Sequence, residues 1–409
     1  MLDVVVKNTE RFLLSVPKTK RKKYGQFFTN MSTAKFMASL FCFDRSKPCL
    51  EILDAGAGTG ILATAVIQKL IDDGYKGRIH VTCYETDDFV MPVLEENMRL
   101  STVLPNVTCS IKTDNYITSQ NFSTYTLFGG EDFHYDYIIG NPPYLKTPKD
   151  AIEALAMPEV CYGAPNLYFL FWAMGIHNLK EGQELVYIIP RSWTSGAYFK
   201  RFREYLFREC VLTDIHLFEK RDKVFDGESV LQETMIVKVK KTRVVPSAIN
   251  ITTSSTSDFK DISSFSAPYE TVVTKNHCVC VVTNSDDVNV LHTINHFSKT
   301  LPEINLKMQT GIIVDFRTRE VLRNELEEGA YPLLYAQHIR EGKIVWPLGK
   351  EGEVIKTERK SYLQENGNFL LVKRFTSKEE PRRLQCGIYL KKKFDKFKYI
   401  STHNKVNFI

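Results

Sequence analysis

The sequence predicts an α/β protein in two parts, with a parallel sheet of alternating strands and helices first and a mixed, β-rich region after it. Short apolar runs alternate with amphipathic segments from residue 50 to about residue 240, which is the pattern of strands and crossover helices. From Leu301 onward, short apolar runs alternate with Gly and Pro, which indicates β structure with little helix. At about 100–200 residues per domain, the 409 residues predict two or three domains.

The first part follows the order strand, helix, strand, helix. Before its first strand, we expect Ser32 to cap a helix, because the apolar residues between Phe36 and Phe41 recur at helical spacing. The predicted elements are then strand 50–53, helix 61–70, strand 79–84, helix 90–100, strand 107–111, strand 135–139, helix 166–178, strand 184–189, helix 198–208 and strand 234–239. Helix 166–178 is apolar almost all round, which predicts burial. Right-handed crossovers produce a parallel sheet, which we expect strand 234–239 to close.

The composition changes after the last predicted strand. Residues 247–266 are rich in Ser and Thr, which is typical of a connector or a variable surface hairpin. We therefore expect one domain in residues 1–245, a connector or variable hairpin region in residues 246–300, and a second domain in residues 301–409.

Charge is distributed unevenly between these regions. The chain has 54 Lys and Arg against 48 Asp and Glu, a formal charge of +6. Residues 1–300 carry 33 basic and 34 acidic side chains, whereas residues 301–409 carry 21 and 14. The basic excess of the second domain favours a polyanionic partner, although a mixed charged surface explains it equally well.

Composition also argues against several classes of protein. The N-terminal residues lack the layout of a signal peptide, and no apolar run approaches the about 18 residues of a membrane span, so we expect a cytoplasmic protein with no membrane partner. Nine scattered cysteines predict reduced thiols. His277, Cys278 and Cys280 come nearest to a metal-binding pattern, but alternation in a strand explains them, and we expect no metal site.

A glycine-rich turn stands where the first strand leads into a helix. The turn contains Asp54, Gly56, Gly58 and Gly60. Glycines at such a position let the backbone turn tightly and let a ligand approach the main chain, and the absence of a following Lys-Ser/Thr pair excludes a P-loop. Glu85 ends the second strand, where a carboxylate commonly binds ribose hydroxyls. NAD and S-adenosylmethionine both fit these residues.

The segment 140–144, Gly-Asn-Pro-Pro-Tyr, follows the strand 135–139 and so lies at the carboxyl edge of the sheet, where open α/β folds bind ligands. Pro142 and Pro143 have fixed φ angles, which makes the turn rigid. Neither has a backbone N–H to donate, and we expect the backbone carbonyls of the turn to point outward. The Asn141 side-chain oxygen and the Pro142 carbonyl can then accept both hydrogens of a planar amino group. Tyr144 offers an aromatic face for a flat base.

The order of these motifs resembles the gamma class of DNA adenine-N6 methyltransferases, typified by the TaqI and PstI modification methylases. The resemblance rests on residues 25–29, 54–60, 141–144, Glu85 and Asp114, and it extends over essentially the whole chain. In the second domain it is closest to the PstI type, through residues 310–317 and 371–380. It implies a Rossmann-like, S-adenosylmethionine-dependent catalytic domain first and a mixed, β-rich target-recognition domain after it.

The resemblance also implies a role for each motif. It assigns cofactor binding to Tyr24, Gln26, Phe27, Thr29, Asp54, Gly56, Gly58, Gly60, Glu85, Thr86, Asp114 and Asn141. Within this set Asp54 holds the methionine amino end, Glu85 the ribose, and Asp114, which as a lone Asp is more often a turn residue, the adenine amino group. It assigns the flipped target adenine to Asn141, Pro142, Pro143, Tyr144 and, as a second aromatic ring, Phe225, with Phe218 close by as the competing choice.

The expected partners are double-stranded DNA, bound in part by the basic residues of the second domain, and a separate cognate restriction endonuclease that acts on the same site. We expect the protein to methylate as a monomer. The chain departs from the family at Asn30, where Pro is usual, and PstI-type enzymes continue beyond the region that matches residues 403–409, so we expect a truncated recognition domain.

Two alternatives remain at this point. One is a non-catalytic subunit that binds DNA and cofactor within a restriction assembly. The other is a methyltransferase that acts on RNA or on a protein amide, because the same Asn-Pro-Pro-Tyr chemistry serves any planar amide. The intact motif argues against the first, and the long basic second domain argues against the other.

Overall fold

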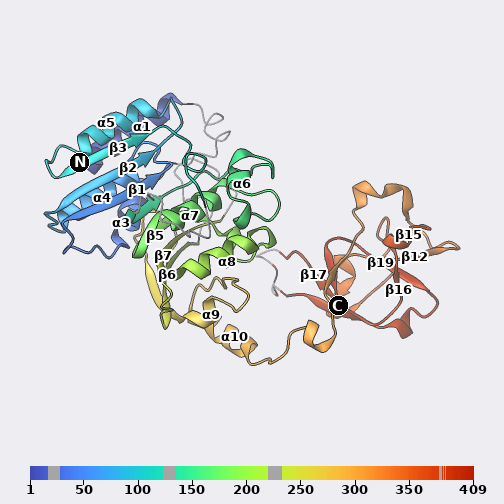
Figure 1. Cartoon of the computed structure of the whole chain (residues 1–409). Coiled ribbons are helices and arrows are strands. Elements are labelled where there is room, and N and C mark those ends of the chain that lie inside the picture. Colours follow the sequence, from blue (N-terminus) through green and yellow to red (C-terminus); the bar gives the residue numbers. More distant parts are fainter. Residues whose placement is uncertain (17–27, 123–134, 220–232, 377–379, 381, 383) are drawn as a thin grey trace. The chain divides into compact units, whose positions relative to one another are not determined.

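The computed structural model describes residues 1–409 except 17–27, 123–134, 220–232, 377–379, 381 and 383 (Figure 1). These residues form two compact units, Met1–Ile294 and Asn295–Ile409. No helix in the described ranges is both long enough and apolar enough to cross a bilayer. Each unit has its own sheets, and the units are described separately below.

The first unit is built on one nine-stranded sheet with the order β3-β2-β1-β4-β5-β7-β6-β8-β9. Its strands are β1 Cys49–Ala55, β2 Arg78–Tyr84, β3 Val107–Lys112, β4 Tyr135–Gly140, β5 Leu179–Pro190, β6 Cys210–Phe218, β7 Thr234–Lys241, β8 Ala248–Ser254 and β9 Ser263–Pro268. Strands β1 to β5 are parallel, as predicted, and β7 runs antiparallel to both of its neighbours. This arrangement is the Rossmann-like α/β fold that the sequence predicts.

The far edge of this sheet differs from the prediction. Strand β7 does not close the sheet, because β6, β8 and β9 lie beyond it. Strand β6 begins directly after the preceding helix and places alternate apolar side chains such as Ile215 and Leu217 in the core. Residues 246–300 supply the β8–β9 hairpin at the edge, so the unit extends to residue 294.

The first unit also contains helices in its described ranges. They are α1 Leu2–Ser15, α3 Met31–Ser39, α4 Ile61–Asp72, α5 Met91–Ser101, α6 Ile152–Ala156, α7 Leu167–Asn178, α8 Lys200–Glu209, α9 Tyr269–Val272 and α10 Ser285–Asn295. Helix α7 is buried along most of its length, which confirms the prediction from its apolar sequence. Helix α1 was not predicted.

The cap of α3 is Asn30, so the prediction of Ser32 was wrong. The side-chain oxygen of Asn30 accepts a hydrogen bond from the Thr33 amide at 2.8 Å, and Ser32 lies inside the first turn. An Asn at this position satisfies an amide that the helix itself leaves without a partner. The residue that departs from the family pattern therefore has a structural role.

The second unit consists of short strands in two sheets. The six-stranded sheet has the order β10-β20-β17-β18-β14-β13, and the five-stranded sheet has the order β11-β15-β12-β19-β16. The strands are β10 Gln309–Thr310, β11 Leu322–Arg323, β12 Ala330–Leu334, β13 Ile339–Arg340, β14 Gly342–Ile344, β15 Val354–Lys356, β16 Gln364–Glu365, β17 Phe369–Lys373, β18 Cys386–Tyr389, β19 Tyr399–Thr402 and β20 Val406–Phe408. After α10, the described part of this unit contains 3-10 turns but no α-helix, which confirms the prediction of β structure with little helix.

Candidate active site

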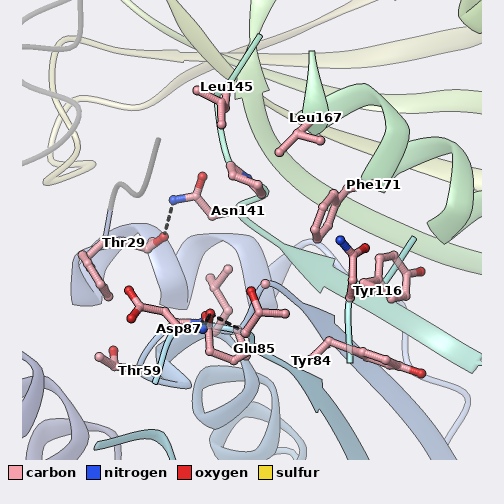
Figure 2. Close-up of a pocket in the computed structure, with 18 of the residues that line it drawn as sticks. Thr29, Thr59, Tyr84, Glu85, Asp87, Tyr116, Asn141, Leu145, Leu167 and Phe171 are labelled. Atoms are coloured by element: carbon pink, nitrogen blue, oxygen red, sulfur yellow. Dashed lines mark hydrogen bonds between the residues drawn. The ribbon is translucent and has the colours of Figure 1, made fainter. Parts of the chain in front are cut away.

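A cavity of about 400 Å³ opens at the carboxyl ends of strands β1 to β4 in the first unit. Figure 2 shows side chains from the loops after these strands, from α4 and from α7 converging on it. Its lining residues are Phe28, Thr29, Gly56, Ala57, Gly58, Thr59, Ile61, Leu62, Tyr84, Glu85, Thr86, Asp87, Asp88, Phe89, Asp114, Asn115, Tyr116, Asn141, Pro143, Leu145, Glu153, Leu167 and Phe171. The volume is in the range of small-molecule sites, about 300–1,000 Å³.

The glycine turn is tied to the end of β2. The amides of Gly56 and Ala57 both donate to the Tyr84 carbonyl at 2.9 Å, and the Gly58 amide donates to the Glu85 carboxylate at 2.9 Å. Gly56 and Gly58 line the cavity, as predicted for a turn that approaches a ligand. The turn is also supported by α1, since the Thr9 hydroxyl donates to the Thr59 hydroxyl at 2.8 Å.

Gly60 does not line the cavity; it starts α4. Its φ of +78° is in the left-handed region, and a Cβ there would lie 2.9 Å from the Met98 sulfur and 3.0 Å from Leu94 Cδ1. Glycine is required at this position by backbone conformation and by packing against α5. Its contribution to a ligand site is therefore indirect.

Glu85 is a buried carboxylate with an organised set of donors. Its Oε2 accepts from the Gly58 amide, and its Oε1 accepts from the Thr86 and Asp87 amides at 2.8 and 2.9 Å. Burial raises the pKa of Glu85, and these three amides oppose that increase by stabilising the charged form. A carboxylate has about four acceptor positions, so this side chain can still accept a hydrogen bond from a ligand hydroxyl.

Asp54, at the end of β1, is fully buried behind the lining rather than on it. Its Oδ2 accepts from the Ala63 amide at 3.0 Å, and its Oδ1 has no hydrogen-bond partner among the described residues. Burial raises the pKa of Asp54 to about 7, helped by the charge of Glu85. A buried oxygen without a donor costs free energy unless a ligand or water supplies one.

The lining is acidic on one side. Glu85, Asp87, Asp88, Asp114 and Glu153 all line the cavity, whereas no Lys, Arg or His does so among the described residues. Such a lining favours a cationic ligand and disfavours one that carries a pyrophosphate. Between the two cofactors that the sequence left open, this charge favours S-adenosylmethionine, which carries a sulfonium and an ammonium, over NAD.

Asn141 directly follows β4, and its side chain has a fixed orientation. Its Nδ2 donates to the Thr29 hydroxyl at 3.1 Å, so its Oδ1 points away from Thr29 (Figure 2). Pro143 and Leu145 line the cavity beside it. The sequence predicts Thr29 and Asn141 as separate contacts, and the structure shows that they are also partners.

Pro142 and Tyr144 are buried and do not line this cavity. The Tyr144 hydroxyl donates to the Ile188 carbonyl at 3.0 Å, and its ring packs edge-to-face with Tyr168. Burial raises the pKa of Tyr144, so this phenol stays protonated. The predicted residues Tyr24, Gln26, Phe27 and Phe225 lie outside the described residues.

Several lining residues were missed by sequence reasoning. Phe171 and Leu167 come from α7, which the sequence marks only as a buried helix, and Tyr116 packs against both Tyr84 and Phe171. The acids Asp87 and Asp88 come two and three residues after the predicted Glu85, so their position was a usable signal. Among the described residues no three His, Cys, Asp or Glu side chains form a metal-binding group, and His277 lies in a turn with φ +58° rather than in a strand.

The matches to known proteins decide the family. Residues 62–225 match the family model described as Eco57I restriction-modification methylase. The chain is 32% identical over 397 residues to the Type II methyltransferase M.BsuBI of Bacillus subtilis, which covers 94% of this chain and 78% of that protein. The chain belongs to the type II restriction-modification methyltransferase family. This assignment confirms the resemblance to such methylases.

Further comparisons agree with membership in the type II methyltransferase family. The chain is 31% identical over 386 residues to the Type II methyltransferase M.PstI of Providencia stuartii, which covers 92% of this chain and 75% of that protein. Among solved structures, a DrdV–DNA complex has a TM-score of 0.52 at 13% identity and covers 95% of this chain and 49% of that one. The latter likeness supports the fold alone.

Proposed function

We propose that this methyltransferase transfers a methyl group from S-adenosylmethionine to the exocyclic N6 amino group of an adenine extruded from a specific site in double-stranded DNA. The observation that carries this proposal is the orientation of Asn141. The Nδ2 of Asn141 donates to Thr29, and this bond orients the side chain so that Oδ1, a hydrogen-bond acceptor, stands at the end of β4 beside the rigid Pro142–Pro143 pair. An acceptor held in this way suits a planar amino group with two hydrogens.

The cavity fits the cofactor by the chemistry of its side chains. The Glu85 carboxylate can accept hydrogen bonds from a ribose diol, and we assign to Asp114, which also lines the cavity, the adenine amino group of the cofactor. The Oδ1 of Asp54, which has no hydrogen-bond partner in the part of the chain that the structure describes, directly precedes the glycine turn in sequence and can accept from an ammonium or a bridging water. The acidic lining compensates the positive charges of the cofactor.

When bound, S-adenosylmethionine supplies an activated methyl group on its sulfonium sulfur. The role of the protein is to position the target nitrogen in line with that methyl group and to keep the nitrogen lone pair available. Asn141 Oδ1 and the Pro142 carbonyl accept the two amino hydrogens, which favours tetrahedral geometry at the nitrogen. The new N–C bond replaces the S–C bond, and the amino nitrogen then loses one proton to solvent.

Extruding a base costs a few kcal/mol, which stacking and backbone contacts offset. We assign stacking to Tyr144 on the strength of the family resemblance. Its ring is buried and does not line the cavity, but its hydroxyl bond to Ile188 and the edge of Tyr168 fix it next to Pro143, which does. Phe225 is retained as the second ring on the strength of the family resemblance. Pro142 contributes through its carbonyl and its fixed backbone.

The second unit is proposed to recognise the DNA sequence. Two exposed aromatic rings there each have an arginine guanidinium lying over them. The guanidinium carbon of Arg374 is 5.2 Å from the ring centroid of Phe375, and that of Arg317 is 5.3 Å from the ring centroid of Phe316. Arginine paired with an aromatic ring suits contacts with bases and phosphates. The other basic residues proposed to contact DNA are Lys373, Lys378, Arg382, Arg383, Lys391, Lys392 and Lys393, of which Lys378 and Arg383 lie outside the described residues.

We further propose that the protein acts in the cytoplasm as a monomer and that it protects DNA from a separate cognate restriction endonuclease.

The test of the proposed methyl transfer is to incubate the purified protein with methyl-labelled S-adenosylmethionine and plasmid DNA, and to digest the DNA to nucleosides. We expect label in N6-methyladenine. Label in cytosine would refute adenine specificity, and binding of DNA and cofactor without label would support a non-catalytic subunit. Label in a ribosomal RNA or release factor but not in DNA would support the amide-methylating alternative.

A further inference from the structure

Next to the cavity, the segment that follows the Asn-Pro-Pro-Tyr loop pairs with the segment that leads into α7 in a short two-stranded ladder. The Leu167 amide donates to the Leu145 carbonyl and the Thr147 amide donates to the Pro165 carbonyl, both at 2.8 Å. Lys146 and Asn166 form an antiparallel bridge between these bonds. Leu145 and Leu167 line the cavity, so the backbone of Lys146 is fixed one residue from the cavity lining and two residues from Tyr144.

The side chain of Lys146 lies over an aromatic ring and is not paired with a carboxylate of the described residues. Its ammonium lies 5.5 Å from the ring centroid of Tyr198, and it makes no ion pair within 4.0 Å with the described residues. Tyr198 itself is 56% exposed. Lys146 is thus an exposed cation beside a cavity whose own lining has no described cation.

Tyr198 is held in place from its other side. A Cβ at Gly163 would lie 3.2 Å from Tyr198 Cε1, so this glycine, whose φ is +81°, allows the loop to approach the ring. Arg201 on α8 fastens the same loop through a bond to the Cys161 carbonyl at 3.0 Å. The neighbouring Tyr162 is 57% exposed. An exposed lysine and two exposed tyrosines are therefore presented on ordered backbone.

We propose that Lys146, Tyr162 and Tyr198 form a contact surface for the DNA strand that carries the extruded nucleotide, with Lys146 bound to a phosphate next to it. This inference rests on the proposed function. A base can leave the duplex only if its flanking backbone is held, and a fixed ammonium beside the cavity supplies that contact. The phenol hydroxyls can donate to the same backbone, and the rings can stack on an unpaired base.

The test measures binding of a fluorescein-labelled duplex that carries the methylation site mapped by sequencing, over a series of salt concentrations. For Lys146→Gln we expect several-fold weaker binding and a plot of log K against log salt whose slope is smaller by about 1, the value for one lost phosphate contact. Tyr198→Leu should weaken binding as well. The affinity for S-adenosylmethionine should stay unchanged in both variants.

The matched control is Lys76→Gln. Lys76 is also exposed, but it precedes β2 and so lies at the opposite end of the sheet from the cavity. Equal slopes and affinities for Lys146→Gln and Lys76→Gln would overturn this inference while leaving the proposed function intact. A wild-type protein that methylates no DNA would instead refute the proposed function, and this inference with it.

Discussion

The two units of the molecule differ in how much regular structure they contain. The first has strands of six to twelve residues in one sheet and a single large core, whereas the second has strands of two to five residues and two small core clusters. The long parallel strands end together, and this is what brings Glu85, Asp114 and Asn141 to one cavity. The second unit has more chain in loops, and it displays exposed pairs such as Arg374 and Phe375.

The proposed function assigns methyl transfer to the first unit and recognition of the DNA sequence to the second, and the structural difference between the units makes this division testable. If the comparison is correct, changes at the sheet edge of the first unit alter methyl transfer or cofactor binding, and changes in the basic residues of the second unit alter DNA affinity alone. The following predictions test that division, from the largest expected effect to the smallest.

Asn141→Ala should reduce methyl transfer by about 10²-fold or more, because it removes the acceptor that orients the target amino group. Cofactor affinity should change by only a few-fold, since Glu85 and the glycine turn are intact. Single-turnover transfer and equilibrium cofactor binding measure the two effects. Full retention of transfer would refute the role given to this side chain.

The burial of Asp54 should make stability depend on pH. The pKa of Asp54 in the folded protein is about 7, above the ordinary value of 3.8. Between these two pH values the folded protein holds a proton on Asp54 that unfolding releases. The free energy of unfolding therefore falls as pH rises from about 4 to about 7 and levels off above it, by at most about 4 kcal/mol at about 1.4 kcal/mol per pKa unit.

Asp54→Asn removes this dependence and serves as the comparison. Urea unfolding of the cofactor-free proteins at about pH 5 and about pH 8 should show that the variant gains stability relative to wild type as pH rises. Glu85, whose pKa burial also raises, is present in both proteins and does not produce the difference. A constant difference between the two pH values would contradict the assignment.

Gly60→Ala should destabilise the first unit by about 1–3 kcal/mol, because it combines an unfavourable φ with contact against Met98 and Leu94. Gly74→Ala is the matched control, since its φ of +77° is nearly the same and nothing lies within 4 Å of the added Cβ. Urea unfolding followed by fluorescence gives both values. Equal losses would show that packing against α5 contributes nothing.

In the second unit, replacing Lys391, Lys392 and Lys393 together by Gln should weaken DNA binding and lower the salt slope by up to about 3, one for each phosphate contact. Cofactor affinity should not change. Fluorescence anisotropy over a salt series checks the first effect and calorimetry the second. An unchanged slope would show that this run is only a solvated surface.

Much of the first unit was predictable because turn-forming residues mark the ends of several of its strands. Strands β1 and β4 end in glycine or proline turns, and the residues after them were placed correctly at one edge of the sheet. Strand β6 was missed because Cys210 follows α8 without such a turn, and α1 was missed because no Ser, Thr, Asp or Asn precedes it as a cap. Both elements were therefore missed because the sequence lacks a local turn or cap signal at their first residue.

The rest of the site depends on contacts between distant residues, which periodicity does not encode. Phe171 reaches the cavity only because α7 packs beside the β4 loop, and the bond between Thr29 and Asn141 joins residues 112 positions apart. The sequence likewise did not indicate that the Asp54 carboxylate is fully buried behind the cavity lining. The positions of the motifs thus indicated which edge of the sheet carries the candidate site. Tertiary packing decided which side chains line the cavity at that edge.

The most direct test of the central claim is modification-sensitive sequencing of DNA from cells that lack other methyltransferases and express either wild-type protein or Asn141→Ala. The account predicts N6-methyladenine at one defined sequence in cells with wild-type protein and its loss in cells with the variant. Absence of modified adenine in cells with stable, soluble wild-type protein would contradict the account.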